Sequence, residues 1–513
     1  MTRTENTIKN IIIALITQAA SILLSMISRS TFISTLGADL LGISGLFASA
    51  ISVLALSELG LGEAMLYLMI KYFAEDDRSK IKAAFEFSKK IYFVVSLIII
   101  GIGIAITPIV FMTINLDTPI PHLYLYYYIF ILNTAFSYLC APYNVVFRAE
   151  QKNRVVTKSA FWSNIAITFF QIVCLYLFKS YILYLILMMM GNFISYAYIR
   201  FMFNRDYAFL KNKNIDYTLG DKEKNEIKHV VKDMFIVKVS GVIMESIDNI
   251  TISKIIGTVI VGIYSNYIVI TKALRTFIKL IYQSLYSSIG NLNMSDTVEK
   301  RKKFFEIEIF IFHIMATISI TGTFILIQDF MKIWIGKEYL LSDSIVIVAC
   351  VDFYFNIIEY ALVNFLQTSY LFKKSKFTSL GMAICNLILS ITLGMKMGLV
   401  GILLATVISR LVMRQGICVM LVYKDLFLEK ANTYYNMILK YVLAALSEVL
   451  IIYLITYSID GTVWYMFIMK LILTMCLSLA ILWLIHKKNP AYEYLKNTME
   501  ETVRKKLGKY KRG

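Results

Sequence analysis

The sequence predicts an all-α integral membrane protein with about fourteen transmembrane helices, in two pseudo-symmetric bundles around a central cavity. Hydrophobic residues occupy 58% of the 513 positions, which is more apolar surface than a soluble fold can bury. A short apolar stretch with two glycines occurs near the start of each half. Lysine and arginine are concentrated in every second loop, as expected for loops on the cytoplasmic side of a membrane.

The repeated stretch reads ISTLGADLLGIS at residues 33–44 and SKIIGTVIVGIY at residues 253–264. Its glycines align in pairs, Gly37 with Gly257 and Gly42 with Gly262. Because glycine adopts positive φ and lets backbones approach, each copy is predicted to be a tight turn between two helices. Such a duplication is typical of transporters built from two related bundles. A third stretch, MGLVGILLATVIS at 397–409, resembles LLGISGLFASAIS at 40–52 and indicates further internal relatedness.

Apolar runs long enough to cross a hydrocarbon core of about 30 Å define the elements in order. Lipid offers no partner to free backbone groups, so each run is predicted to be helical. The spans are 11–36, 43–70, 91–114, 123–147, 159–179, 181–203, 231–256, 260–288, 304–327, 343–370, 377–395, 399–423, 437–458 and 463–486. The first run is too long for a signal peptide and is predicted to be a retained helix.

Positive charge sets the predicted orientation. The net charge is +18, and topology explains it better than nucleic-acid binding does. Basic residues cluster in alternate loops, at 71–90, 148–158, 205–232, 300–303 and 373–376, and in the tail from 487. The intervening loops hold only Lys179, Lys332, Lys337 and Lys396. Both termini are therefore predicted to be cytoplasmic.

The longest polar segment divides the chain. Residues 204–230 are predicted to be a cytoplasmic linker, with an N-terminal transmembrane bundle of about six helices at 1–203 and a C-terminal bundle of about eight helices at 231–486. Residues 487–513 form a predicted basic cytoplasmic tail. The lysines of the linker are predicted to face solvent, with contact to anionic headgroups as the alternative.

Signatures of the common enzyme classes are missing from the sequence. It has no GxxxxGK(S/T), GxSxG or HExxH motif and no zinc-type cysteine pair. We therefore predict a protein that is not an enzyme, has no metal site or cofactor, and does not itself hydrolyse ATP. The six cysteines lie in or beside apolar runs and are interpreted as small buried residues. The four histidines, His122, His229, His313 and His486, are scattered and receive no predicted role.

Charges inside spans are the candidate functional residues, because a charge in hydrocarbon is costly unless it faces a water-filled cavity or a partner. Lys272, Arg275 and Lys279 stand at i, i+3 and i+7, so they share one face of the eighth span. A cationic stripe suits a phosphate-bearing substrate, because arginine offers a planar fork and lysine a compact charge. The alternative is that Lys279 extends to the inner interface and Arg275 pairs with an acid.

Three further arginines are candidates for the same cationic cavity. Arg29 lies on the first span, and the repeat offset places it opposite Asn249 at a similar depth. Arg410 and Arg414 are four residues apart on one face and could add to the cavity, while Asp352 and Glu359 are further charges within spans.

Three carboxylates are candidates for ion coupling or gating, namely Glu58, Glu245 and Asp248. Glu245 and Asp248 share a helical face at i, i+3, and Arg275 lies near the depth of Glu58 by the repeat offset. They could bind a proton or a sodium ion, or they could simply neutralise the arginines, which is the simpler interpretation.

Two stretches resemble bacterial polysaccharide flippases of the Wzx type. STLGADLLGISGLFASAISVLALSELGLGEAMLY at 34–67 is similar to the first helix pair of that family, and DNITISKIIGTVIVGIYSNYIVI at 248–270 is similar to its seventh and eighth helices. The family belongs to the multidrug/oligosaccharidyl-lipid/polysaccharide (MOP) exporter superfamily. Related lipid II flippases keep arginines on the first and eighth helices, where this chain has Arg29 and Arg275. Those relatives have an acidic residue where this chain has Ser30, which argues against lipid II itself as the substrate.

The resemblance implies a flippase of the bacterial cytoplasmic membrane. It would move undecaprenyl-diphosphate-linked oligosaccharide repeat units to the outer leaflet, for capsule, exopolysaccharide, O-antigen or teichoic-type polymers. It implies alternating access, a cationic cavity and coupling to a proton or sodium gradient. The implied partners are membrane lipids, a polysaccharide polymerase and glycosyltransferases, and no nucleic acid.

Two other functions are weighed against this one. A multidrug exporter of the same superfamily predicts an acidic or aromatic cavity with few cations, which the stripe at 272–279 disfavours. A membrane glycosyltransferase or polysaccharide polymerase needs a sizeable outer loop or an acidic catalytic site, and every predicted outer loop is short.

Overall fold

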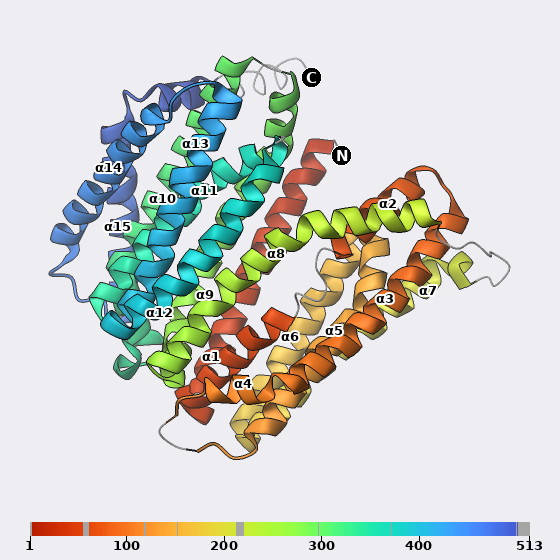
Figure 1. Cartoon of the computed structure of the whole chain (residues 1–513). Coiled ribbons are helices and arrows are strands. Elements are labelled where there is room, and N and C mark those ends of the chain that lie inside the picture. Colours follow the sequence, from red (N-terminus) through yellow and green to blue (C-terminus); the bar gives the residue numbers. More distant parts are fainter. Residues whose placement is uncertain are drawn as a thin grey trace. The chain divides into compact units, whose positions relative to one another are not determined.

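Every secondary-structure element that the computed structural model describes is a helix, which confirms the all-α prediction. The structure describes residues 3–54, 61–116, 119–150, 152–211, 220–295, 297–369, 371–498 and 500. These form two compact units, unit 1 at Met1–Ser265 and unit 2 at Asn266–Gly513. Each unit is described separately below (Figure 1).

Unit 1 is a bundle of long helices. Its elements are α1 (Arg3–Leu54), α2 (Leu61–Ala74), α3 (Arg78–Ala105), α4 (Thr107–Met112), α5 (Leu123–Ala149), α6 (Asn153–Phe178), α7 (Tyr181–Asp206), η2 (Ala208–Lys211) and α8 (Asp221–Ile255). α5 packs against α3 and α7, and α7 also packs against α6. α1 packs against α6, and α8 contacts α1 and α2. α9 (Thr258–Ser295) begins in unit 1 and continues in unit 2.

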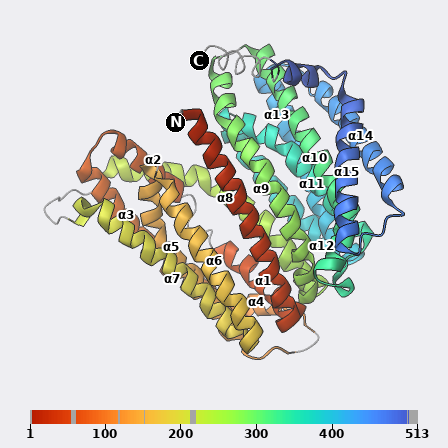
Figure 2. The same cartoon turned by 180° about the vertical axis from the view of Figure 1, so that it is seen from behind.

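The core of unit 1 is largely aromatic. The ring of Phe203 on α7 stacks on Phe85 of α3, with ring centroids 4.7 Å apart, and meets the edge of Tyr143 on α5 at 4.9 Å. These three helices run side by side in both views (Figures 1 and 2). Offset and edge-to-face ring contacts stabilise such a core beyond the area they bury.

Unit 2 is also a helical bundle. Its elements after α9 are α10 (Val298–Trp334), η3 (Lys337–Tyr339), α11 (Asp343–Thr368), α12 (Phe372–Arg410), the π-helical η4 (Leu411–Cys418), α13 (Val419–Val422), the π-helical η5 (Tyr423–Phe427), α14 (Asn432–Thr456) and α15 (Trp464–His486). α10 packs against α11, α14 and α15, and α11 packs against α12. α10 is therefore the central helix of this unit.

Among the described residues, ten helical runs are long and apolar enough to cross a membrane. Two of them contain a break in helical conformation, at Gly37 in α1 and at Gly398 in α12, so each corresponds to two predicted spans. α8 and α9 are not among these ten runs, and they occupy the predicted spans 231–256 and 260–288. The predicted span 43–70 is not one described helix, because residues 55–60 separate α1 from α2 and lie outside the description.

The predicted linker at 204–230 is only partly described. α7 and η2 fill its first residues, α8 begins within it at Asp221, and residues 212–219 lie outside the description. The compact units divide later, after Ser265, because α8 packs on α1 and α2. The predicted boundary at this linker therefore stays a prediction.

Candidate substrate-binding site

Both copies of the repeated stretch contain the predicted tight turn. Gly37 has a φ of +85° and Gly257 a φ of +142°, in the region that favours glycine. The second turn is fixed by Thr258, whose N–H donates to the carbonyl of Asn115 at 2.9 Å. Asn115 in turn donates its N–H to the Thr258 hydroxyl at 3.0 Å. Gly398, in the third related stretch, also has a positive φ, of +60°.

The two copies cross directly at their second glycines. A Cβ on Gly262 would lie 2.6 Å from the carbonyl oxygen of Ala38 and 2.8 Å from the nitrogen of Gly42. A Cβ on Gly42 would overlap the carbonyl of Thr258. Ala38 and Thr258 are equivalent positions in the alignment, so the contact is reciprocal. The duplication therefore has a structural counterpart, a near-symmetric crossing of two helices inside unit 1.

Polar side chains join the two copies on either side of this crossing. Arg29, on the first helix of copy one, donates from Nη2 to Ser265 Oγ on the second helix of copy two. Asn249, the position equivalent to Arg29, donates to Ser49 Oγ on the second helix of copy one at 2.8 Å. The predicted correspondence of Arg29 and Asn249 thus appears as two related hydrogen bonds across the crossing.

Arg29 lies in a cavity of 480 Å³ within unit 1. The polar groups that line it are Ser21, Ser25, Ser28, Arg29 and Ser44 of α1, Asn164, Thr168 and Gln171 of α6, Tyr184 of α7 and Ser265 of α9. Ser21, Ser25 and Ser28 stand at i, i+4 and i+7, so one face of α1 presents hydroxyls to the cavity. The cavity combines one guanidinium with many uncharged hydrogen-bonding groups.

This lining suits a ligand with phosphate oxygens and many hydroxyls. A guanidinium binds phosphate oxygens through paired N–H donors. Serine and threonine hydroxyls, asparagine and glutamine amides and tyrosine hydroxyls both donate and accept, as sugar hydroxyls do. The cavity volume lies in the range of small-molecule sites, which is about 300–1,000 Å³.

The predicted cationic stripe lies on α9, within unit 2. Arg275 is half-buried, with its guanidinium carbon 5.6 Å from the ring centroid of Phe353. Its Nε is buried with no hydrogen-bond partner among the described residues. Lys272 and Lys279 are exposed. Arg275 is therefore the member of the stripe whose surroundings are those of a ligand-binding or structural cation, and its predicted role in substrate binding stays a prediction.

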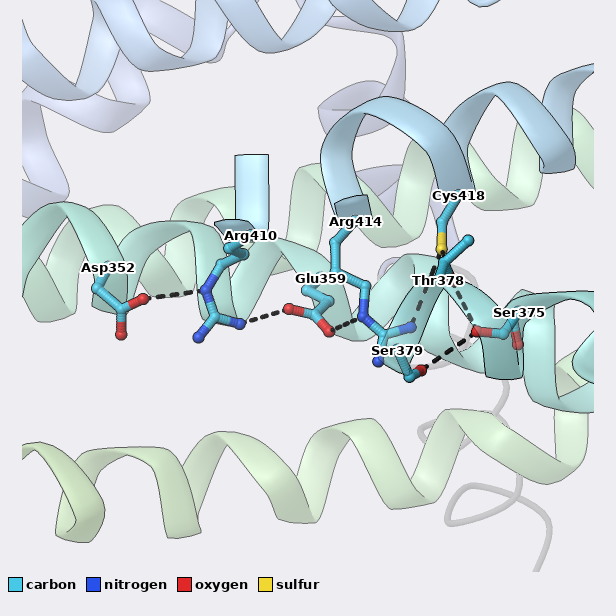
Figure 3. A network of polar contacts seen from close by, with 8 residues as sticks. All are labelled: Asp352, Glu359, Ser375, Thr378, Ser379, Arg410, Arg414 and Cys418. Atoms are coloured by element: carbon cyan, nitrogen blue, oxygen red, sulfur yellow. Dashed lines mark hydrogen bonds and ion pairs between the residues drawn. The ribbon is translucent and has the colours of Figure 1, made fainter. Parts of the chain in front are cut away.

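Arg410 and Arg414 lie against carboxylates of α11 (Figure 3). Arg410 Nε lies 3.0 Å from Asp352 Oδ1, and its Nη1 lies 2.5 Å from Glu359 Oε2. Arg414 Nε lies 2.9 Å from Glu359 Oε1, an ion pair without hydrogen-bond alignment. The four side chains form an alternating, charge-balanced row. As it stands, this row offers little free positive charge to a substrate, and the predicted contribution of both arginines to a cationic cavity stays a prediction.

The predicted coupling carboxylates are only partly covered by the structure. Glu58 and the side chain of Glu245 lie outside the described part of the chain. Asp248 is half-buried on α8, one residue before Asn249 of the helix crossing. The roles predicted for these three residues stay predictions.

No protein-family model and no curated protein sequence matches the chain. Solved structures do match it. The lipid II flippase MurJ, in an inward closed conformation, matches with a TM-score of 0.66 and 17% identity, over 93% of this chain and 99% of that one. An inward-facing MATE multidrug resistance transporter of the MOP superfamily matches with a TM-score of 0.63 and 14% identity, over 78% of this chain and 96% of that one. An outward-facing MATE structure gives a TM-score of 0.54 at 14% identity, over 78% and 91% of the two chains.

The chain has the fold of the MOP superfamily transporters. The resemblance seen in the two glycine-rich stretches is thereby confirmed at the level of the superfamily fold. The matched MATE structures are almost fully covered but leave more than a fifth of this chain unmatched. The MurJ structure leaves far less, since the match extends over 93% of this chain.

Most of the polar lining of the cavity around Arg29 is not among the residues predicted from the sequence. Asn164, Thr168 and Gln171 stand at i, i+4 and i+7 on α6, a span otherwise rich in apolar residues. Two amides and one hydroxyl on one face of a membrane helix indicate that this face lies inside the bundle. A criterion based on charge does not select these residues, because each is uncharged.

Proposed function

We propose that this chain is a flippase of the bacterial cytoplasmic membrane. It would move undecaprenyl-diphosphate-linked oligosaccharide repeat units from the cytoplasmic to the outer leaflet by alternating access, for surface polysaccharide synthesis. The observation that carries the proposal is the cavity in which Arg29 lies among hydroxyls and amides. The fold shared with a structure described as a lipid II flippase supports the same class of cargo.

The chemistry of the cavity favours a hydrated, anionic headgroup over an apolar cargo. Polar side chains within a membrane bundle are expensive to bury without partners, and a sugar headgroup satisfies them when it binds. Arg29 would contact the diphosphate, while the α6 amides and α1 hydroxyls would contact sugar hydroxyls. The polyprenyl tail needs no such site because it stays in the bilayer. Arg275, Lys272 and Lys279 are proposed as further contacts for the headgroup.

The environment of the protein is part of the proposal. Both termini face the cytoplasm, and the driving force is a proton or sodium gradient, since the sequence has no phosphate-binding loop. A polysaccharide polymerase and glycosyltransferases of the same pathway would supply and use the cargo.

A multidrug exporter is the second candidate, because two MATE structures share the fold. Such an exporter moves organic cations and needs an acidic or apolar binding surface. The described cavity around Arg29 has a cationic group instead. Ethidium efflux from cells that express the chain tests this function directly.

The test of the flippase function uses the purified full chain in proteoliposomes with a fluorescent undecaprenyl-diphosphate oligosaccharide. Exposure of the sugar to an impermeant quencher measures flipping. Arg29→Gln should lower the initial rate by about 10- to 100-fold, the loss expected for one charge-assisted hydrogen bond. Arg200→Gln is the matched control, because Arg200 is exposed on α7 and bonds only Tyr196 among the described contacts.

Two outcomes oppose the proposal. A wild-type chain that moves ethidium but not the labelled lipid would establish the multidrug function. An Arg29→Gln chain that flips at the wild-type rate would remove the cavity from the substrate path.

A further inference from the structure

The last membrane helix buries a polar face. α15 has five buried residues, Lys470, Thr474, Ser478, Leu482 and His486, which recur at every fourth position. Four of the five are polar, although α15 is among the most apolar helices of the chain. A helix in lipid gains nothing from a buried polar stripe unless the stripe has partners or a function.

The partners come mainly from α10, on the same helical pattern. His313, Thr317, Thr321 and Asp329 recur along α10 at i, i+4, i+8 and i+16, and all are buried. At one end, Lys470 Nζ lies 2.7 Å from Asp329 Oδ2. In the middle, Glu448 of α14 accepts from Ser478 at 2.5 Å and from Thr321 at 3.3 Å. At the other end His313 contacts His486. Titratable groups therefore lie at both ends and in the middle of the polar contact between α10 and α15.

The two histidines share a hydrogen bond that either ring can donate. His313 Nε2 lies 3.1 Å from His486 Nε2, so one nitrogen carries a hydrogen and the other accepts it. The second nitrogen of His313, Nδ1, lies 2.9 Å from the Tyr354 hydroxyl and 3.2 Å from the Thr317 hydroxyl. Hydroxyls both donate and accept, so both tautomers of His313 are satisfied. A proton taken up at one ring nitrogen can therefore be released from the other.

The pair has room for one extra proton. A single added proton makes an imidazolium–imidazole hydrogen bond, which is stronger than the neutral one. A second proton would leave two like-charged N–H donors facing each other across 3.1 Å. The Tyr441 ring stacks on His313 with centroids 4.4 Å apart and planes at 3°, so its face stabilises the positive ring.

The surroundings of the pair are aromatic and hydroxylic. Tyr354 comes from α11 and Tyr441 from α14, and Asn489, beyond α15, donates to the Tyr441 hydroxyl at 3.3 Å. Among charged groups, Glu306 of α10 acts electrostatically on Tyr441, and Lys487 lies over the Trp483 ring. No ion pair recorded for the described residues holds either histidine, so the charge of the pair can change.

The pair can be reached from two directions. His486 is the last residue of α15 and is followed by Lys487 and Lys488, at the end predicted to be cytoplasmic. On the other side, Tyr354 lines a cavity of 890 Å³ within unit 2, which also touches Asp329 and Lys470. Tyr354, whose hydroxyl lies 2.9 Å from His313 Nδ1, is thus part of the lining of this cavity.

We propose that His313 and His486 form a proton-binding site that couples transport to a proton gradient. A proton moves between the cavity, Tyr354, His313 and His486, bonding to one ring nitrogen as another proton leaves the opposite nitrogen. The site carries one proton per transport cycle. The coupling rests on the proposed flippase function for its cargo, whereas proton binding by the pair does not.

The first experiment measures proton binding by the purified full chain. Histidine labelled with ¹⁵N gives signals from only four residues, and those lost in His313→Gln identify the pair. Both rings should change together as the pH is lowered, with uptake of one proton. His122→Asn, at an exposed position with φ +60° that asparagine tolerates, should leave the pair unchanged. A wild-type pair that stays neutral down to the lowest pH at which the chain remains folded would overturn the proposal.

The second experiment measures coupling in proteoliposomes with the membrane potential clamped at zero. One proton per labelled lipid predicts a leaflet ratio of about tenfold for a pH difference of one unit. His313→Gln should still equilibrate the lipid but reach a ratio of one. Tyr354→Phe should keep proton binding and slow the approach to the coupled ratio by about tenfold.

The outcomes separate the two proposals. His313→Gln chains that reach the wild-type ratio refute the site. A wild-type chain that binds the proton but moves no lipid refutes the flippase function and leaves the site standing. Should His313→Gln fail to fold, the wild-type titration and Tyr354→Phe decide, because the latter change removes one hydroxyl and preserves the ring.

Discussion

Gly42 and Gly262 lie against each other where the two copies of the repeat cross, and each faces a backbone carbonyl of the other copy. No side chain fits between two backbones at that separation. The crossing therefore depends on both glycines, and it holds the helix that carries Arg29 beside the helix that carries Ser265.

We expect Gly42→Ala and Gly262→Ala each to destabilise the protein. The added methyl group meets backbone that cannot move aside, and overpacking of this kind costs about 1–3 kcal/mol. Thermal stability in detergent, followed by size-exclusion chromatography, measures the loss. Gly101→Ala on α3 is the control, because its Cβ would meet open space and alanine is the better helix former. Equal stability of the Gly42 and Gly101 variants would contradict the crossing.

Glu359 is the shared partner of Arg410 and Arg414, so its loss should cost more than the loss of Asp352. Glu359→Gln removes the ionised partner of two largely buried guanidinium groups. We expect the free energy of unfolding to fall by about 3–5 kcal/mol. Asp352→Asn leaves Arg410 its bond to Glu359 and should cost less. Unfolding in increasing concentrations of a denaturing detergent ranks the stabilities of the variants, with Glu338→Gln at an exposed position as the reference. A stable Glu359→Gln chain that has lost flipping would instead return these arginines to the substrate site.

Arg275 should be needed for flipping through its charge and its shape. Arg275→Ala should abolish export of polymer in a flippase-deleted strain, and Arg275→Lys should be partly active, because lysine keeps the charge but loses the planar fork. Membrane protein level is the control for folding. Exposed Lys272→Ala should have the smaller effect. Full export by Arg275→Ala would remove this residue from the site.

The predicted orientation can be checked by labelling. In a cysteine-free background, single cysteines at Asp39 and Asp460 should react in intact cells with an impermeant thiol reagent. Cysteines at Asp77 and Lys302 should react only after the cells are opened, because their loops are on the positively charged side. The reverse pattern would invert the topology.

The fold was predictable because its signals are local. Long apolar runs predict membrane helices, and the shared glycines of the two stretches predict turns, which the positive φ of Gly37 and Gly257 confirms. The ion pairs of Arg410 and Arg414 were harder, because they depend on how α11 packs against α12. A partial signal existed, since Asp352 and Glu359 are seven residues apart and share a helical face.

The histidine pair is not predictable from the sequence alone. His313 and His486 are 173 residues apart, and each alone is one polar residue in an apolar run. The missed signal was periodic: Lys470, Thr474, Ser478 and His486 recur at multiples of four on an otherwise apolar helix. Such a stripe indicates that the polar face of the helix is turned away from lipid, but it does not indicate which other helix packs against that face.

The polar face shared by α10 and α15 has a consequence for biosynthesis. The ribosome completes α10 at residue 334 and begins α15 at residue 464, an interval of 464 − 334 = 130 residues. At about 5–20 residues per second, the newly inserted α10 waits roughly 6–26 seconds for its partner. During that time His313 and Asp329 have no α15 to bond, and lipid cannot replace it. Chains that stop before α15 should therefore be held by insertion factors or degraded by membrane proteases, so that only a completed chain persists.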